Sequence, residues 1–270
     1  MAMDIRMMGI MAYDEALQLQ ESLQAARIRD EIPDTLLLLE HPPVITMGRR
    51  AKQENILVPR QVLDRMGVQV TDINRGGDVT YHGPGQMVGY PIFDLKHHGR
   101  DIRLFLERLE DIFIRVLSRY GIEAHRETGR HTGVFAGPDK IVAFGISVRQ
   151  WVTLHGFAFN INTDLSHFSW IVPCGLEDRG VTSMQKLLGR LVPMKQVMEE
   201  VAVLFQEVFP GDEDLPEVVP EILKISADSG SIPVNALNGI HNCNDSGVFT
   251  GPDGVSADTC ESISDKGVCA

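Results

Sequence analysis

The sequence predicts an α/β fold for residues 1–210, followed by an extension of different composition. Along residues 1–210, segments with the periodicity of amphipathic helices alternate with short apolar runs typical of strands. The composition is that of a globular protein, since 43% of the 270 residues are hydrophobic and 23% are charged. A chain of this length holds enough apolar material to bury a sizeable core.

Four segments have the apolar spacing of helices. They are residues 13–30, 101–121, 182–189 and 194–209. The inward face of the second is predicted to consist of Phe105, Leu109, Ile112, Phe113, Val116 and Tyr120. Gly121 is expected to end that helix, because glycine adopts a left-handed backbone without steric cost. Thr182 or Ser183 is the expected N-cap of the third.

Shorter segments rich in β-branched and other apolar residues are predicted as strands. They are residues 35–41, 42–48, 68–73, 87–95, 133–137, 140–148 and 155–162. The last two alternate clearly between apolar and small or polar residues. Between 68–73 and 87–95 lies a glycine-rich segment, which is expected to form a loop.

Residues 211–270 are predicted to be a flexible acidic extension, rich in Gly, Asp and Ser. After Pro210 the chain has 11 acidic residues against 2 lysines, so this part contributes most of the net charge of −12. It also contains Cys243, Cys260, Cys269 and His241. Their spacing fits no standard zinc pattern with close cysteine pairs, so no metal site is predicted.

The charge pattern and the N-terminus exclude several classes of protein. No basic stripe offers the phosphate-neutralising charge that nucleic-acid binding requires. The N-terminus lacks the basic start and long apolar core of a signal peptide, and no run of 18 apolar residues is present. We therefore expect a cytoplasmic protein that binds neither nucleic acid nor membrane, with its thiols reduced.

Three segments carry residues suited to chemistry. The first is "RGGDVTYHGPGQ", Arg75 to Gln86, where glycines allow close approach of backbone to a ligand. It lacks the Gly-Lys-Ser/Thr of a phosphate-binding loop and the glycine order of a dinucleotide site. By composition alone it is equally consistent with a tight structural connection.

The second and third segments supply a lysine and a cysteine. Lys140 opens an apolar strand in "GPDKIVAFGISV", where a lysine usually points to solvent. If it faces a pocket instead, its ammonium would favour a nearby thiolate. Cys174 in "IVPCGL" is the only cysteine before residue 211. This stretch alone is equally consistent with an inert buried cysteine and with a nucleophile. Lys140, His82 and His155 are the candidate groups for activating it.

Taken together and in this order, these motifs resemble the octanoyltransferases of lipoate biosynthesis, the lipoyl(octanoyl) transferases. "LLLLEHPPVITMGRRA" also matches that family's N-terminal pattern, and the resemblance covers about residues 10–205. It implies a mixed β-sheet flanked by helices, like the catalytic domain of lipoate and biotin protein ligases. It also implies that residues 1–210 form the catalytic domain.

The resemblance also implies an activity. The family transfers an octanoyl group from octanoyl-acyl carrier protein to a lysine of lipoyl domains, through a cysteine thioester. The acceptors are the lipoyl domains of 2-oxoacid dehydrogenase complexes and the glycine cleavage H protein. No cofactor is expected, because the donor thioester is already activated. Arg49, Arg50 and Lys52 are candidates for docking these acidic partners.

The resemblance further assigns roles to residues of this chain. Cys174 is the acyl-bearing nucleophile, and Lys140 is the group that lowers its pKa. The implied substrate-binding residues are Arg75, Gly76, Gly77, Asp78, Val79, Thr80, Tyr81, His82, Ala143, Phe144, Gly145, Gly156, Phe157 and Ala158. An eight-carbon chain also needs an apolar tunnel, and Phe144, Phe157 and Val79 are candidates for its walls. Burying six methylenes there would contribute about 5 kcal/mol.

Three other functions are considered. The nearest is an ATP-dependent lipoate or biotin protein ligase, but the Gly-Arg-Gly-type nucleotide loop of such ligases is missing here. A binding module without catalysis would need neither Cys174 nor Lys140. A papain-like hydrolase lacks its family-specific sequence around the cysteine.

Overall fold

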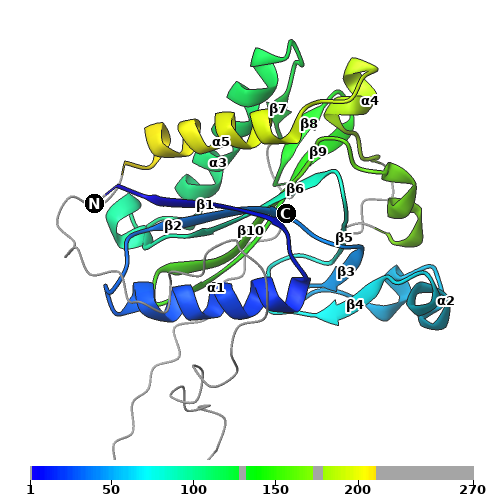
Figure 1. The fold of residues 1–270 in the computed structure, drawn as a ribbon, viewed down its shortest axis with the longest axis horizontal. Helices are drawn as coiled ribbons and strands as arrows, with labels where there is room; N and C mark the ends of the chain where they lie inside the picture. The colour runs from blue at the N-terminus through cyan, green and yellow to red at the C-terminus, as the bar shows by residue number, and fades with distance from the viewer. Residues whose placement is uncertain (1, 128–131, 173–178, 211–270) are drawn as a thin grey trace, which may run out of the picture. The chain divides into compact units, whose positions relative to one another are not determined.

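The computed structural model describes residues 2–127, 132–172 and 179–210. Within these ranges the strands form one seven-stranded and one three-stranded sheet. The larger sheet has the order β1-β2-β6-β10-β9-β8-β7 and is flanked by helices on both faces (Figure 1). The predicted fold class, a mixed sheet flanked by helices, is confirmed. The predicted extension from residue 211 lies outside the described residues, so the domain boundary stays a prediction.

The seven-stranded sheet is mixed because one of its strand pairs is parallel. Its strands are β1 (Asp4–Ile10), β2 (Thr35–Glu40), β6 (Gln86–Ile92), β10 (Val152–Asn160), β9 (Asp139–Arg149), β8 (Val134–Ala136) and β7 (His125–Arg126). β1 runs parallel to β2, and every other neighbouring pair is antiparallel. The edge strand β1 was not predicted. Its side chains are only partly buried, and Met7 and Ile10 are 40% and 65% exposed, so the sequence lacks a strong alternation there.

Helices cover the two faces of this sheet (Figure 1). α1 (Tyr13–Ile28) packs on β6 and β10. α3 (Ile102–Arg119) and α5 (Met194–Val208) contact each other across the opposite face. The predicted inward face of α3 is confirmed, except that Tyr120 is only partly buried. Gly121 follows with a φ of +71°, the left-handed backbone expected of a helix stop.

The three-stranded sheet has its own core. It consists of β4 (Gln69–Asp72), β3 (Val44–Met47) and β5 (Val79–His82), with β3 in the centre. Ile45, Val79 and Tyr81 pack there against α2 (Arg60–Arg65) and the short helix η3 (Leu165–Trp170). The prediction of a loop for the whole glycine-rich segment was wrong, since β5 lies inside it. Its four residues are too few to outweigh the surrounding glycines in the sequence.

The remaining helices are short. They are η1 (Gln53–Asn55), η2 (Leu95–His98) and α4 (Met184–Leu188). Ser183 is the N-cap of α4, because its side chain accepts a hydrogen bond from the backbone N–H of Lys186 at 3.2 Å. This selects Ser183 over Thr182. In the part of the chain that the structure describes, no helix is both long and apolar enough to cross a bilayer. The cytoplasmic location stays a prediction.

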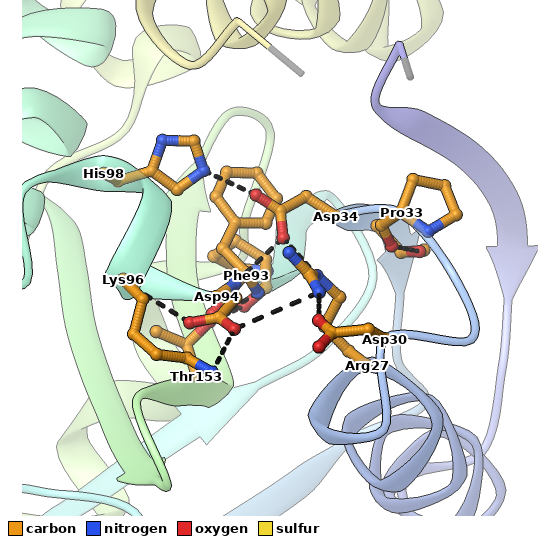
Figure 2. A network of polar contacts seen from close by, with 11 residues as sticks. Arg27, Asp30, Pro33, Asp34, Phe93, Asp94, Lys96, His98 and Thr153 are labelled. Carbon is orange, nitrogen blue, oxygen red and sulfur yellow. Dashed lines mark hydrogen bonds and ion pairs between the residues drawn. The ribbon is translucent and has the colours of Figure 1, made fainter. Parts of the chain in front are cut away.

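A buried ionic network joins α1 to the ends of β2 and β6 (Figure 2). Asp34, which is 1% exposed, accepts hydrogen bonds from Arg27 Nε at 2.8 Å and His98 Nε2 at 2.5 Å. It also accepts one from the backbone N–H of Asp94 at 2.8 Å. Burial alone would raise the pKa of Asp34, but the hydrogen bond from His98 and the charge of Arg27 hold it below its usual value. The folded protein therefore needs Asp34 ionised.

We expect Asp34→Asn to lower the free energy of unfolding by about 3 kcal/mol, because it leaves Arg27 buried beside a neutral group. Urea denaturation measures this. Since the pKa of Asp34 is lower in the folded state, its contribution is present above the unfolded value of about 3.9 and is lost as the pH falls through the folded value. Stability of the variant should therefore depend less on pH in the acid range.

The control for this prediction is Arg29→Gln. Arg29 and Glu31 form an ion pair at 2.7 Å, but both side chains are exposed, at 57% and 42%. Its removal should cost less than about 1 kcal/mol. Equal losses in the two variants would contradict a special role for the buried network.

Candidate active site

Arg75 fixes the glycine-rich segment against β3. Its guanidinium is buried and donates hydrogen bonds to the carbonyl oxygens of Thr46 and Asp78, at 2.8 and 2.7 Å. It also donates to the Thr46 hydroxyl, from Nη2 at 3.0 Å, and to the Gly76 carbonyl oxygen, from Nη1 at 2.8 Å. Gly77 has a φ of +95°, which favours glycine at this turn. The segment is thus held in one conformation by its own arginine.

The residues of β5 alternate between two environments. Val79 and Tyr81 are buried in the core of the three-stranded sheet. Thr80 and His82 line a pocket on the other side, together with Arg75. Val79 is absent from this lining, so its side chain is placed away from the tunnel wall for which it was a candidate.

Small residues of β9 and β10 form part of the pocket lining. Ala143 pairs with Ala158, and Gly145 pairs with Gly156, across the two antiparallel strands. These four residues line the pocket of about 450 Å³, a volume that includes open solvent. A Cβ atom at Gly145 would lie 3.1 Å from Arg75 Cδ. Glycine therefore allows the arginine segment to lie this close to the sheet.

Phe144 and Phe157, the other two candidates for tunnel walls, also line the pocket. Their rings contact Phe113 of α3, with centroid distances of 5.9 and 4.6 Å. They therefore belong to the main core as well. The pocket is bounded by a well-packed layer that holds the two strands in place.

Sequence reasoning missed three lining residues, Tyr13, Val88 and Tyr90. Tyr13 and Tyr90 belong to an aromatic group around His41. In the sequence, His41 stands out only as part of the motif "LLLLEHPPVITMGRRA". His41 Nδ1 lies 2.7 Å from the Met11 carbonyl oxygen, so this nitrogen must carry the proton and donate. His41 Nε2 then accepts from the Tyr90 hydroxyl at 2.7 Å. Nothing in the spacing of these residues indicates that they meet.

The histidines at this site are neutral at pH 7. Burial lowers the pKa of His82 to about 3, with a further contribution from His41. Burial and the charge of Arg75 lower the pKa of His155 to about 3. A neutral imidazole cannot stabilise a thiolate as a cation. Of the three groups that the sequence suggested for activating Cys174, Lys140 is thus the remaining candidate for a cation, and a neutral histidine could act only as a hydrogen-bond donor.

Lys140 is buried and lines a second pocket, so of the two alternatives that the sequence left open, solvent or a pocket, the structure shows the pocket. Its ammonium donates to the Thr132 carbonyl oxygen at 3.0 Å and lies 5.3 Å from the centre of the Phe135 ring. The second pocket, about 480 Å³ including open solvent, shares Thr80, Ala143 and Ala158 with the first. Lys140 therefore borders the same pocket as Thr80 and Gln86 of the glycine-rich segment.

Cys174 lies outside the described residues, and its distance to Lys140 stays undetermined. The chain after that segment is described from Arg179, whose guanidinium carbon lies 5.5 Å from the centre of the same Phe135 ring that Lys140 contacts. The Gly180 carbonyl oxygen then accepts a hydrogen bond from the backbone N–H of Lys140 at 3.0 Å. Residues that follow the cysteine in sequence thus contact Lys140 directly.

Among the described residues, one group brings three metal-ligating atoms within 4.8 Å of one another, Asp30, Asp94 and His97. Asp94 is ion-paired with Lys96 at 2.9 Å, and Arg27 bonds Asp30 at 2.6 Å (Figure 2). These cations already neutralise the carboxylates and would repel a metal ion. We assign no metal to this group.

Residues 12–206 match the family model of the lipoyl protein ligase A/B catalytic domain. The octanoyltransferase of Caldicellulosiruptor saccharolyticus is 54% identical over 226 residues, which cover 81% of this chain and 96% of the relative. That of Caldicellulosiruptor bescii is 56% identical over 210 residues, covering 77% and 92%. The chain belongs to the octanoyltransferase family. The resemblance inferred from the motifs is confirmed, and with it the prediction of an acyltransferase.

Solved structures share the fold of this octanoyltransferase family member. A lipoate protein ligase candidate from T. acidophilum superposes with a TM-score of 0.62 at 16% identity, over 77% of this chain and 85% of that chain. A lipoate-protein ligase A bound with ATP gives 0.61 at 17% identity, again over 77% and 85%. At these identities the likeness establishes the fold alone.

The anchoring of Arg75 can be tested with Thr46→Val, which keeps the shape of the side chain but removes the hydroxyl that accepts from the guanidinium. We expect the free energy of unfolding to fall by about 1–2 kcal/mol. The KM of the acyl donor should rise several-fold, because Arg75 lines the pocket. Urea denaturation and steady-state kinetics measure the two effects.

Thr35→Val is the matched control. Thr35 is equally buried in a strand, and its hydroxyl donates to the Pro33 carbonyl oxygen at 3.1 Å. Its loss should lower stability by about 1 kcal/mol or less and leave the KM unchanged. An unchanged KM in Thr46→Val would show that this hydroxyl does not hold the substrate segment.

Proposed function

We propose that this protein transfers an octanoyl group from octanoyl-acyl carrier protein to a lysine of lipoyl domains, through a thioester on Cys174. The named activity of its relatives supports octanoyl transfer. The observation that supports the mechanism is the burial of Lys140 in a pocket that Thr80 and Gln86 of the glycine-rich segment also line. A lysine that is buried at the edge of a pocket favours a role in catalysis, because a lysine that only keeps a protein soluble lies exposed on the surface.

The first half-reaction is thioester exchange. The thiolate of Cys174 attacks the carbonyl carbon of the donor thioester, and the carbon–sulfur bond to the carrier breaks. The carrier thiolate takes the proton of the Lys140 ammonium and leaves as a thiol, so Lys140 becomes neutral. One thioester replaces another, so the step is nearly isoenergetic and needs no ATP. The ammonium of Lys140 would lower the pKa of the thiol by favouring the thiolate.

The second half-reaction forms an amide. The amine of the acceptor lysine attacks the acyl-enzyme carbonyl, the bond to Cys174 breaks, and the thiolate is regenerated. The amine loses a proton in this step, and Lys140 in its neutral form could accept it. Formation of an amide from a thioester is downhill, so no further energy source is required.

The two pockets offer a place for the substrates. The proposed substrate-binding residues are those of segments 75–82, 143–145 and 156–158. Nine of these residues line the first pocket, namely Arg75, Thr80, His82, Ala143, Phe144, Gly145, Gly156, Phe157 and Ala158. Among the small ones, Ala143 and Ala158 border both pockets, which leaves room for an apolar chain alongside. Burying six methylenes there would supply about 5 kcal/mol of binding energy.

We expect incubation with octanoyl-acyl carrier protein, without ATP or Mg²⁺, to add one octanoyl unit to Cys174, as seen by intact-mass spectrometry. Cys174→Ser should form no thioester adduct. Lys140→Met should slow acylation by about 100-fold or more and shift alkylation of Cys174 by iodoacetamide to higher pH. A requirement for ATP would instead indicate a ligase.

Lys186→Met is the control for the lysine variant. Lys186 lies nearby, with its ammonium 3.6 Å from the carboxylate of Asp139, but its side chain is 57% exposed. Its removal should leave acylation and the alkylation profile unchanged. If Lys140→Met kept the wild-type alkylation profile, Lys140 would not be the activator of the thiol.

Docking of acidic partner proteins is assigned to the exposed residues Arg49, Arg50 and Lys52. The backbone N–H groups of Arg49 and Arg50 donate to the carbonyl oxygens of Arg75 and Gly77, at 3.1 and 3.0 Å. This basic segment is therefore fixed beside the glycine-rich segment. Its positive charge would attract acidic carrier and lipoyl domains towards the pocket.

Arg50→Glu should raise the KM for octanoyl-acyl carrier protein by about tenfold at low salt, with a smaller effect at high salt. Arg103→Glu, an equal charge change at an 88% exposed position of α3, should have little effect. Steady-state kinetics at two salt concentrations measure both. Similar KM values for the two variants would exclude docking at this segment.

A further inference from the structure

A chain of buried side-chain hydrogen bonds connects His82 to the segment that precedes α4. It begins at the Thr182 carbonyl oxygen, which can only accept a hydrogen bond. Asn160 Nδ2 lies 3.0 Å from this oxygen and must therefore be the donor. The amide of Asn160 is thus oriented with its Oδ1 directed to the other side, where Gln86 is its partner.

Gln86 is the next side chain in this series of hydrogen bonds, between Asn160 and His82. Its Nε2 donates to Asn160 Oδ1 at 2.9 Å and to the Tyr81 carbonyl oxygen at 3.2 Å. Because the Tyr81 oxygen can also only accept, two independent contacts fix the orientation of the Gln86 amide. Its Oε1 is consequently the atom that lies 2.8 Å from His82 Nδ1.

The orientation of Gln86 decides the tautomer of His82. An amide oxygen cannot donate, so Nδ1 must carry the proton in this contact. In a neutral ring, Nε2 is then unprotonated and presents a lone pair. His82 lines the first pocket, and among the described residues no hydrogen-bond partner is found for its Nε2. Within the part of the chain that the structure describes, this nitrogen is an acceptor without a donor.

The surroundings of His82 keep its ring neutral. The ring stacks on Tyr13 at a centroid distance of 6.3 Å and meets the edge of His41 at 5.9 Å. Its burial, together with the positive charge of Arg75 and the nearby His41 and His155, opposes protonation and keeps its pKa at about 3. His82 therefore does not serve as a proton carrier near pH 7, but it is suited to accept a hydrogen bond.

We propose that Gln86 and Asn160 are positioning residues that hold His82 with its Nε2 lone pair towards the pocket, where it binds an N–H group of a substrate. This deepens the proposed function and rests on it. Both substrates carry such a group: the amide of a carrier's thioester arm, and the amine of the acceptor lysine. In a buried pocket, an unpaired acceptor favours a ligand that supplies the missing donor.

The tautomer is tested first in the free protein, by long-range ¹H–¹⁵N correlation spectra of ¹⁵N-histidine-labelled enzyme at pH 7. The His82 signals are assigned by their loss in His82→Asn. We expect a protonated Nδ1 and a bare Nε2. A protonated Nε2 or a doubly protonated ring would overturn the proposal, whether or not the enzyme transfers octanoyl groups.

Two variants test the positioning role. Gln86→Met removes the acceptor, and Asn160→Ala breaks the chain one step further away. In each, the His82 spectrum should show a mixture of tautomers. Asn162→Ala is the matched control, because Asn162 bonds the backbone of Val192 at 2.8 and 3.0 Å and takes no part in the chain. An Nδ1-protonated ring in both variants would contradict the positioning role.

Kinetics then identify the substrate group. Gln86→Met and Asn160→Ala should raise the KM of either the acyl donor or the lipoyl domain by about tenfold, the effect of a lost hydrogen bond of about 1.4 kcal/mol. The kcat should change less than about twofold. A rise for octanoyl-pantetheine but not for an amide-free octanoyl thioester identifies the thioester arm. A rise only for the lipoyl domain identifies the acceptor amine. Unchanged KM values, or equal rises for both thioesters, would overturn the proposal.

Discussion

The close approach of the glycine-rich segment to strand β9 is the contact on which the site depends. A side chain at Gly145 would reach within 3.1 Å of Arg75 Cδ and 3.2 Å of the Gly76 carbonyl oxygen. Its partner Gly156 is constrained more strongly, since a Cβ there would lie 2.0 Å from the Gly89 carbonyl oxygen. Gly145 thus allows Arg75, from the loop between β4 and β5, to border the pocket, and Gly156 allows β6 to lie close to β10.

Electrostatics divide the ionisable groups of the site into two kinds. The histidines are buried near Arg75, and both burial and its charge keep them neutral. Each ring contacts the oxygen of a neighbouring amide, Gln86 for His82 and Asn74 for His155. Lys140 differs because its ammonium contacts a carbonyl oxygen and an aromatic face, both of which favour a cation. The buried histidines and the buried lysine of the two pockets therefore differ in the contacts that surround them.

Several elements escaped prediction for physical reasons. The turn between β9 and β10 places Gln150 and Trp151 at φ values of 50° and 70°, although this pair lacks the asparagine–glycine signature of such turns. Consequently β10 begins at Val152, three residues before its predicted start. His155 also has a positive φ, of 60°, and its Nε2 contacts the side chain of Asn74 in the glycine-rich segment. Local sequence preferences do not report backbone conformations that tertiary packing imposes.

The sequence by itself determined the family and the alternation of helices and strands, and it singled out the motifs from which the site residues are proposed. These follow from local patterns and motifs, which need no knowledge of spatial neighbours. Only the tertiary structure decided that Lys140 is buried beside a pocket, that Val79 faces a different core, and that His82 is bound by Gln86. Each of these depends on contacts between strands far apart in the chain. Such contacts are set by sheet order and register, which periodicity alone does not specify.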